Sequence, residues 1–176
     1  MIEELRDIRT EWEPEKKSTY NGFQTPTDIN LLAIPSGNIA QLKSIIVAEL
    51  DRYYEKFQNE RCSYMRKWPK QKNLYGWHVI LKQQGYQTPH IHVAGWLSGV
   101  IYLQVVPSLN KNEGAIEFGL NSPNYMADSL PTIVHQPAAG DVVFFPSSLH
   151  HRTIPFSTDA DRIVVAFDLL PDPVSH

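Results

Sequence analysis

The hydrophobic positions of the chain follow two different periods. From Ile39 to Phe57 apolar residues recur at helical spacing, which predicts one amphipathic helix with a single buried stripe. From about Leu74 onward the pattern changes to short runs rich in Val, Ile, Phe and Tyr, separated by Gly, Pro, Asn and Asp. Five such runs predict strands: WHVILKQQ, GVIYLQVVP, AIEFG, DVVFFP and RIVVAFDLL.

These patterns predict a mainly β protein of the α+β class. Many short strands at this spacing are typical of a barrel or a two-sheet jelly roll, and the helix is expected to support the sheet. We expect a single domain over residues 1–176. It divides into a helical or irregular leader (1–72), a β core (73–171) and a short tail (172–176). The segment NKNEG, residues 110–114, predicts a hairpin turn between two strands.

Composition is that of a globular protein with no bias towards a charged partner. Apolar residues make up 42% of the 176, charged residues 20%, and the formal net charge is −3. This charge argues against broad binding to nucleic acid or to an anionic membrane. The one basic stretch, 61–72, fits a solvated face or a docking surface for an acidic partner. A single cysteine, Cys62, excludes an internal disulfide and a cysteine-based zinc cluster. With no signal peptide and no long apolar run, a cytoplasmic location is expected.

Histidines supply the candidate chemistry. His90 and His92 are one residue apart, so on a β-strand both would point to the same face and could converge on one metal ion. About 59 residues later come His150 and His151, neighbours of which only one can face such a site. Iron(II) that activates oxygen is held by three protein ligands on one face, usually two His and a carboxylate. Here a histidine stands in the HxD carboxylate position.

Arg162 begins the last predicted strand and has two interpretations. An arginine that points inward among apolar neighbours is costly unless it is paired with an anion. A dicarboxylate such as 2-oxoglutarate is a good partner, because guanidinium binds carboxylate through two hydrogen bonds. Alternatively, Arg162 lies at a strand end and pairs with Asp159 or Asp161. Spacing alone leaves both interpretations open.

Four blocks of sequence together resemble a known family. Residues 89–103, 114–119, 140–156 and 161–171 are similar, in the same order, to the iron(II)/2-oxoglutarate-dependent oxygenases found fused to tetratricopeptide repeats in bacteria. The similarity extends from Trp77 to Pro171. The chain departs from the family pattern at Val93, where proline is usual. Its leader contains no tetratricopeptide array, so the chain resembles the catalytic domain alone.

The resemblance implies a double-stranded β-helix (jelly roll) with iron(II) at its open end and with 2-oxoglutarate and O₂ as cosubstrates. Matched position by position, it implies His90, His92 and His151 as metal ligands and Arg162 as the partner of the far carboxylate of 2-oxoglutarate. Tyr102, Ser98 and Thr153 are candidate hydroxyls to bind 2-oxoglutarate, although Tyr102 is explained equally well as a strand aromatic. Trp77 and Trp96 could line the pocket, with core packing the simpler interpretation.

The expected activity is hydroxylation of an aliphatic C–H bond, with release of succinate and CO₂. The substrate would be an amino acid, a peptide or a small metabolite, chosen by loops at 20–34 and 120–132. One alternative is a cupin-type protein that binds metal through three histidines and does not use 2-oxoglutarate, although Trp96 stands where the first cupin signature has Glu. Another is a binding module with no catalytic function. The exposure of Arg162 and the metal content of the protein distinguish the three.

Overall fold

The structure is a computed structural model that describes residues 1–35, 37–119 and 130–173. The helices described before the long strand β3 are α1 (Ile2–Arg6), the short 3-10 helix η1 (Leu31–Ala33), α2 (Gly37–Phe57) and α3 (Ser63–Arg66). The described strands are β1 (Glu11–Trp12), β2 (Thr19–Gln24), β3 (Leu74–His90), β4 (Leu97–Gln104), β5 (Ile116–Gly119), β6 (Ile133–His135), β7 (Val142–Pro146), β8 (His150–Thr153) and β9 (Arg162–Leu169).

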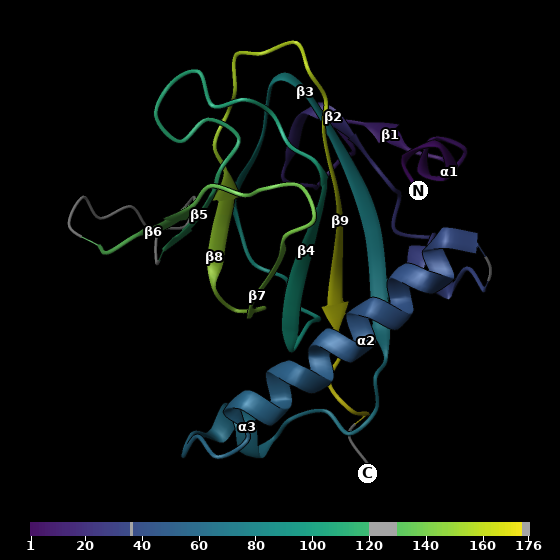
Figure 1. The fold of residues 1–176 in the computed structure, drawn as a ribbon, viewed down its shortest axis with the longest axis vertical. Helices are drawn as coiled ribbons and strands as arrows, with labels where there is room; N and C mark the ends of the chain where they lie inside the picture. The colour runs from purple at the N-terminus through teal and green to yellow at the C-terminus, as the bar shows by residue number, and fades with distance from the viewer. Residues whose placement is uncertain (36, 120–129, 174–176) are drawn as a thin grey trace.

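The strands form one curled antiparallel sheet, in the order β6-β5-β8-β3-β9-β4-β7. Figure 1 shows the long strand β3 curving through the fold, with β9 and β4 beside it. Over residues 74–81 β3 pairs with β9, and nearer its end it pairs with β8. This arrangement confirms the predicted jelly-roll architecture. The helix predicted from Ile39 to Phe57 is α2, which begins two residues earlier.

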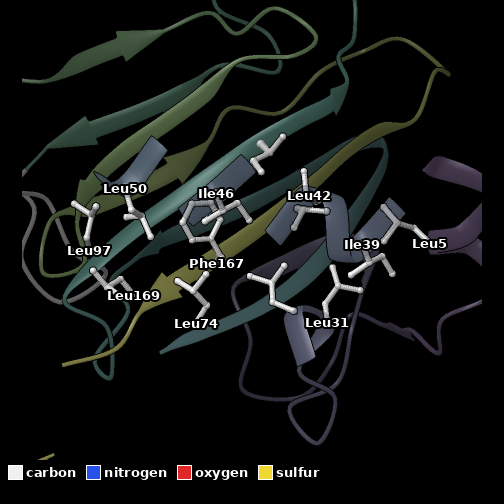
Figure 2. Packing of buried hydrophobic residues seen from close by; sticks show 13 residues of the cluster. Leu5, Leu31, Ile39, Leu42, Ile46, Leu50, Leu74, Leu97, Phe167 and Leu169 are labelled. Atoms are coloured by element: carbon white, nitrogen blue, oxygen red, sulfur yellow. The ribbon is translucent and has the colours of Figure 1, made fainter. Parts of the chain in front are cut away.

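Helix α2 supports the outer face of this sheet. Its buried stripe is Ile39, Leu42, Ile46 and Leu50. The stripe packs on residues of β3, β4 and β9 such as Phe167, which is fully buried (Figure 2). Because side chains alternate along a strand, successive residues of β9 point to opposite faces of the sheet. Val165, Phe167 and Leu169 pack in the cluster that includes α2, whereas Val164 and Ala166 pack in a second cluster inside the roll. The even-numbered residues, from Arg162 to Asp168, therefore face the interior of the roll. No helix within the described ranges is both long and apolar enough to cross a membrane.

The sequence predicted a leader that is helical or irregular, but the leader also contains two strands. Strands β1 and β2 form an antiparallel pair, and β2 continues the sheet by pairing with β3. The segment TYNGFQ that forms β2 is mostly polar and contains a glycine, so its local pattern does not predict a strand. Pairing with β3 supplies the missing backbone hydrogen bonds, and it brings the leader alongside β3.

The predicted hairpin at residues 110–114 is also wrong. The segment does turn, with Asn112 and Gly114 at positive φ. The Glu113 carboxylate accepts hydrogen bonds from the backbone N–H groups of Leu109 and Asn110, from the Asn110 side-chain amide and from the Ser157 hydroxyl. It connects β4 to β5, which do not pair with each other. β4 pairs with β7 and β9, whereas β5 pairs with β6 and β8.

Candidate metal centre

Three histidine side chains meet where β3 and β8 lie side by side. His90 and His151 are direct partners in the β3–β8 register, and their ring centroids are 4.2 Å apart. The His92 ring lies 5.3 Å from that of His90 and 4.9 Å from that of His151. One nitrogen of each ring lies within 4.8 Å of the other two. The strand pairing therefore brings together residues far apart in the sequence at a spacing that suits one metal ion.

His92 reaches this cluster by a route that the sequence did not predict. β3 ends at His90, so the two histidines of the pair are not on the same strand. His92 lies in the turn that follows. Its backbone N–H donates to the Ser147 carbonyl (2.9 Å), and its carbonyl accepts from Gly95 (3.2 Å). The turn, rather than the alternation of a strand, directs the His92 ring towards the other two.

Hydrogen bonds leave the same nitrogen free in each ring. The Nδ1 atoms of His90 and His151 lie 2.7 Å from the Thr88 carbonyl and 3.1 Å from the Leu149 carbonyl. A carbonyl only accepts, so both Nδ1 atoms carry the proton and both Nε2 atoms keep a lone pair. His92 Nδ1 lies 2.7 Å from an Asp168 carboxylate oxygen, which imposes the same tautomer. All three Nε2 atoms are thus suited to bind a metal.

Burial keeps two of the rings uncharged at neutral pH. It lowers the pKa of His90 to about 4 and that of His151 to about 2, and in each case repulsion from neighbouring histidines adds to the effect of burial. A metal ion binds neutral imidazole, so it would have no proton to displace at neutral pH. Of the two neighbouring histidines, His151 joins the cluster. His150 is only half-buried and has no ring contact with His90 or His92 among the described residues.

Arg162 faces the interior from the first position of β9 and is only 2% exposed. Its Nε donates to the Gly114 carbonyl (3.1 Å), and its guanidinium carbon lies 5.0 Å from the centre of the Tyr102 ring. No carboxylate within the described ranges lies within 4 Å of the guanidinium. Asp161, the pairing considered from sequence, instead binds Lys82 at 2.7 Å. Burial lowers the pKa of Arg162, but an arginine keeps its charge in proteins.

The three candidate hydroxyls lie in different surroundings. Tyr102 packs on Arg162 and is fully buried; burial raises the pKa of its hydroxyl, and the guanidinium charge beside it lowers that pKa. Ser98 lies beside His92, where its hydroxyl donates to Asp168 (2.6 Å). The Thr153 hydroxyl bonds the Gln87 side chain (3.3 Å). Only Tyr102 therefore adjoins the arginine.

A cavity of about 560 Å³ opens beside the histidine cluster. His90 and His92 line it, together with Trp77, whose ring meets the edge of His92 at a centroid distance of 5.2 Å. The leader closes another side with Gln24, Thr25 and Thr27 from the expected lid segment, and with Lys16 and Lys17. Trp96 instead packs on the core beneath α2. The second expected lid, 120–132, lies mostly outside the described residues.

Two features of the site have little or no signal in the sequence. Asp168 lies on the same face of β9 as Arg162, in an otherwise apolar run. A carboxylate on the inner face of a buried strand was the available signal. Lys16 and Lys17 had no readable signal, because only the pairing of β2 with β3 brings the leader to the cavity.

Comparison with known proteins agrees with this geometry. A family model described as "Putative 2OG-Fe(II) oxygenase" matches residues 75–168, which is more than half of the chain. The match does not concern tetratricopeptide repeats, so the resemblance to repeat-fused oxygenases stays a prediction. No curated protein matches the sequence.

Solved structures share the fold at low identity. A Pseudomonas putida prolyl-4-hydroxylase has a TM-score of 0.60 and 12% identity over 98% of this chain and 84% of its own. HygX from Streptomyces hygroscopicus, with nickel and 2-oxoglutarate bound, has a TM-score of 0.58 and 14% identity over 97% and 76%. A 2OG-Fe(II) oxygenase family protein from Burkholderia pseudomallei has a TM-score of 0.59 and 11% identity over 97% and 78%.

Proposed function

The chain belongs to the 2OG-Fe(II) oxygenase family, and we propose that it hydroxylates an aliphatic C–H bond of an amino acid, a peptide or a small metabolite. In this proposal His90, His92 and His151 hold iron(II) through their Nε2 atoms. Three imidazoles on one side of an ion leave positions for 2-oxoglutarate and O₂. When bound, iron(II) and 2-oxoglutarate would supply the oxidation, in which one oxygen atom of O₂ enters succinate, the other enters the substrate, and CO₂ leaves.

The observation that carries the proposal is the buried Arg162 on the inner face of the same roll. Removing a guanidinium from water without a carboxylate partner is costly, so a fold that keeps one there is suited to an anionic ligand. We assign the far carboxylate of 2-oxoglutarate to this role, because a guanidinium can bind it through two parallel N–H···O bonds. The Tyr102 hydroxyl, whose ring packs on this guanidinium, is our candidate for a third.

The same observation weighs against the cupin-type alternative. The three-histidine cluster fits both functions, since neither its ligand atoms nor its spacing depends on a cosubstrate. A protein that does not use 2-oxoglutarate has no need of a buried arginine without a carboxylate partner. A solvent-exposed Arg162 would have favoured the cupin function, and the side chain is instead 2% exposed.

The substrate would occupy the 560 Å³ cavity. Trp77 and Ile91 offer it apolar surface beside the histidines, and this surface can hold an aliphatic group near the metal while it excludes water. Lys16 and Lys17 lie on its leader side. Asp168, the one acidic residue among the described lining residues, is bound to His92 and Ser98. Such a charge distribution favours a substrate with an acidic group.

The test is the conversion of 2-oxoglutarate to succinate. Purified protein would be incubated with iron(II), 2-oxoglutarate and O₂, together with pairs of compounds that differ only in a carboxylate or its amide. We expect succinate to form in step with a hydroxylated product, faster with the acid of each pair, and not in the His151→Ala variant. Succinate at the background level with every pair would count against the oxygenase, and equal rates with acid and amide would count against the acidic substrate.

A further inference from the structure

His92 differs from the other two histidines in what lies behind it. Its Nδ1 meets a carboxylate oxygen of Asp168 at 2.7 Å, whereas His90 and His151 meet neutral backbone carbonyls. The His92 and Asp168 side chains are each only 9% exposed. A charged acceptor therefore stands behind one ligand of the cluster, and it is the ligand in the position where a carboxylate is usual.

A second hydrogen bond, from Ser98, holds the Asp168 carboxylate in place. Ser98 is its direct partner across β4 and β9, and the Ser98 hydroxyl donates to the same carboxylate oxygen at 2.6 Å. That hydroxyl also lies 2.9 Å from His92 Nδ1 and 2.8 Å from the Ser147 hydroxyl. Both serines are buried. The carboxylate is thus aimed at His92 by the register of the sheet.

The turn that carries His92 packs directly on this network. A Cβ at Gly95 would lie 2.4 Å from the Ser147 hydroxyl oxygen and 3.0 Å from the Asp168 carboxyl carbon. The backbone N–H of His92 also donates to the Ser147 carbonyl. Only glycine permits this approach, so main chain and side chains together fix the His92 ring.

We propose that Asp168 is a positioning residue for the metal centre, acting through His92. A carboxylate that accepts the Nδ1 proton fixes the ring's tautomer and orientation and makes Nε2 a stronger ligand. In a two-histidine, one-carboxylate centre the carboxylate ligand supplies a negative charge. Asp168 supplies such a charge here without binding the metal, because His92 lies between them. Asp168 is not in the group of three whose ligand atoms converge. This inference rests on the proposed metal-binding function.

The experiment is a titration of cobalt(II) into metal-free protein, followed by calorimetry and by the visible spectrum of the bound ion. Asp168→Asn keeps the size of the side chain and an oxygen that accepts from Nδ1, but it removes the charge. We expect it to weaken cobalt binding about 10- to 100-fold and to shift the spectrum. Asp172→Asn is the matched control, because this partly exposed carboxylate also accepts two hydrogen bonds but does not line the cavity beside the cluster. It should change neither readout.

A double-mutant cycle separates action through His92 from a general structural effect. In a His90→Ala background, Asp168→Asn should still weaken cobalt binding at least several-fold, whereas in a His92→Ala background it should have no further effect. Ser98→Ala, which removes one donor to the carboxylate, should show a smaller loss with the same dependence on His92. It provides a second test if Asp168→Asn lowers the thermal stability of the metal-free protein.

Each outcome has a distinct meaning. Unchanged affinity and spectrum in both Asp168→Asn and Ser98→Ala, with tight binding by the wild type, would overturn the role of Asp168 and leave the metal centre intact. An equal loss in the presence and absence of His92 would overturn it too, because Asp168 would then act as a ligand or as a structural residue. No cobalt binding by the wild type would contradict the metal centre itself.

Discussion

Replacing Arg162 with methionine should abolish discrimination between 2-oxoglutarate and a ligand that lacks its far carboxylate. Methionine keeps much of the packing against Tyr102 but has no charge. The Gly114 carbonyl loses its donor in this variant, at a cost to stability of about 1–3 kcal/mol. Removal of a buried charge with no carboxylate partner offsets part of that cost. We therefore expect the variant to fold.

The magnitude follows from the hydrogen bonds that a guanidinium makes to a carboxylate. A bond to a charged group contributes about 1.5–3 kcal/mol, so loss of the pair should cost about 3 kcal/mol, or roughly 100-fold in Kd. The comparison ligand is 2-oxopentanoate, which keeps the 1-carboxylate, the 2-oxo group and the chain length. The affinity of 2-oxopentanoate should differ less than about threefold between the wild type and Arg162→Met, because this ligand has no carboxylate to pair with Arg162.

The assay is calorimetry with nickel(II)-loaded protein. In the wild type 2-oxoglutarate should bind about 100-fold more tightly than 2-oxopentanoate, and in Arg162→Met the two should bind about equally. Arg162→Lys should fall between, because an ammonium is a point charge without the planar fork. If the preference for 2-oxoglutarate survived in Arg162→Met, Arg162 would not be its anchor. A variant that had simply lost its fold would bind both ligands more weakly, so a loss of affinity for 2-oxoglutarate alone excludes that explanation.

Three further predictions concern the fold and the turn beside the site. Burial lowers the pKa of His78 to about 4. Between pH 6.5 and pH 4 His78 is therefore protonated in the unfolded chain but not in the folded chain, so the stability of the fold decreases as the pH decreases. The free energy of unfolding, measured with urea on metal-free protein, should fall between pH 7 and pH 4.5 by about 2 kcal/mol less in His78→Asn than in the wild type. Equal falls in the two proteins would refute this. Ile46→Ala should cost about 2–5 kcal/mol in the same assay and leave cobalt affinity unchanged, because α2 packs on the outer face. Gly95→Ala should weaken cobalt binding, since its Cβ would collide with Ser147 and displace the His92 turn, and unchanged affinity would contradict this.

The sequence predicted the architecture because local patterns agree with the fold. The run from Arg162 to Leu169 is rich in β-branched and aromatic residues and forms one buried strand, and the helix ending at Phe57 has an apolar stripe that needs a sheet to cover it. Strand pairings were beyond reach, because a turn signal such as that at 110–114 does not say which strands it joins. For the same reason the polar strand β2 was missed, since only β3 gives it hydrogen-bond partners.

The candidate site was predictable as residues but not as geometry. The HxH pair and the later histidine could be singled out, and the structure brings His90, His92 and His151 together. The route of His92 depends on a turn held by Ser147, a contact that no local pattern encodes. Asp168 likewise acquires its neighbour only through folding, because 76 residues separate it from His92.

The central claim is that this chain binds 2-oxoglutarate on a metal held by three histidines. Its most direct test is an anaerobic calorimetric titration of 2-oxoglutarate into metal-free protein, with and without one equivalent of iron(II). We predict one 2-oxoglutarate bound per chain when iron(II) is present, and binding at least about 100-fold weaker without it. Binding that is equally tight without iron, or absent with it, would contradict the claim.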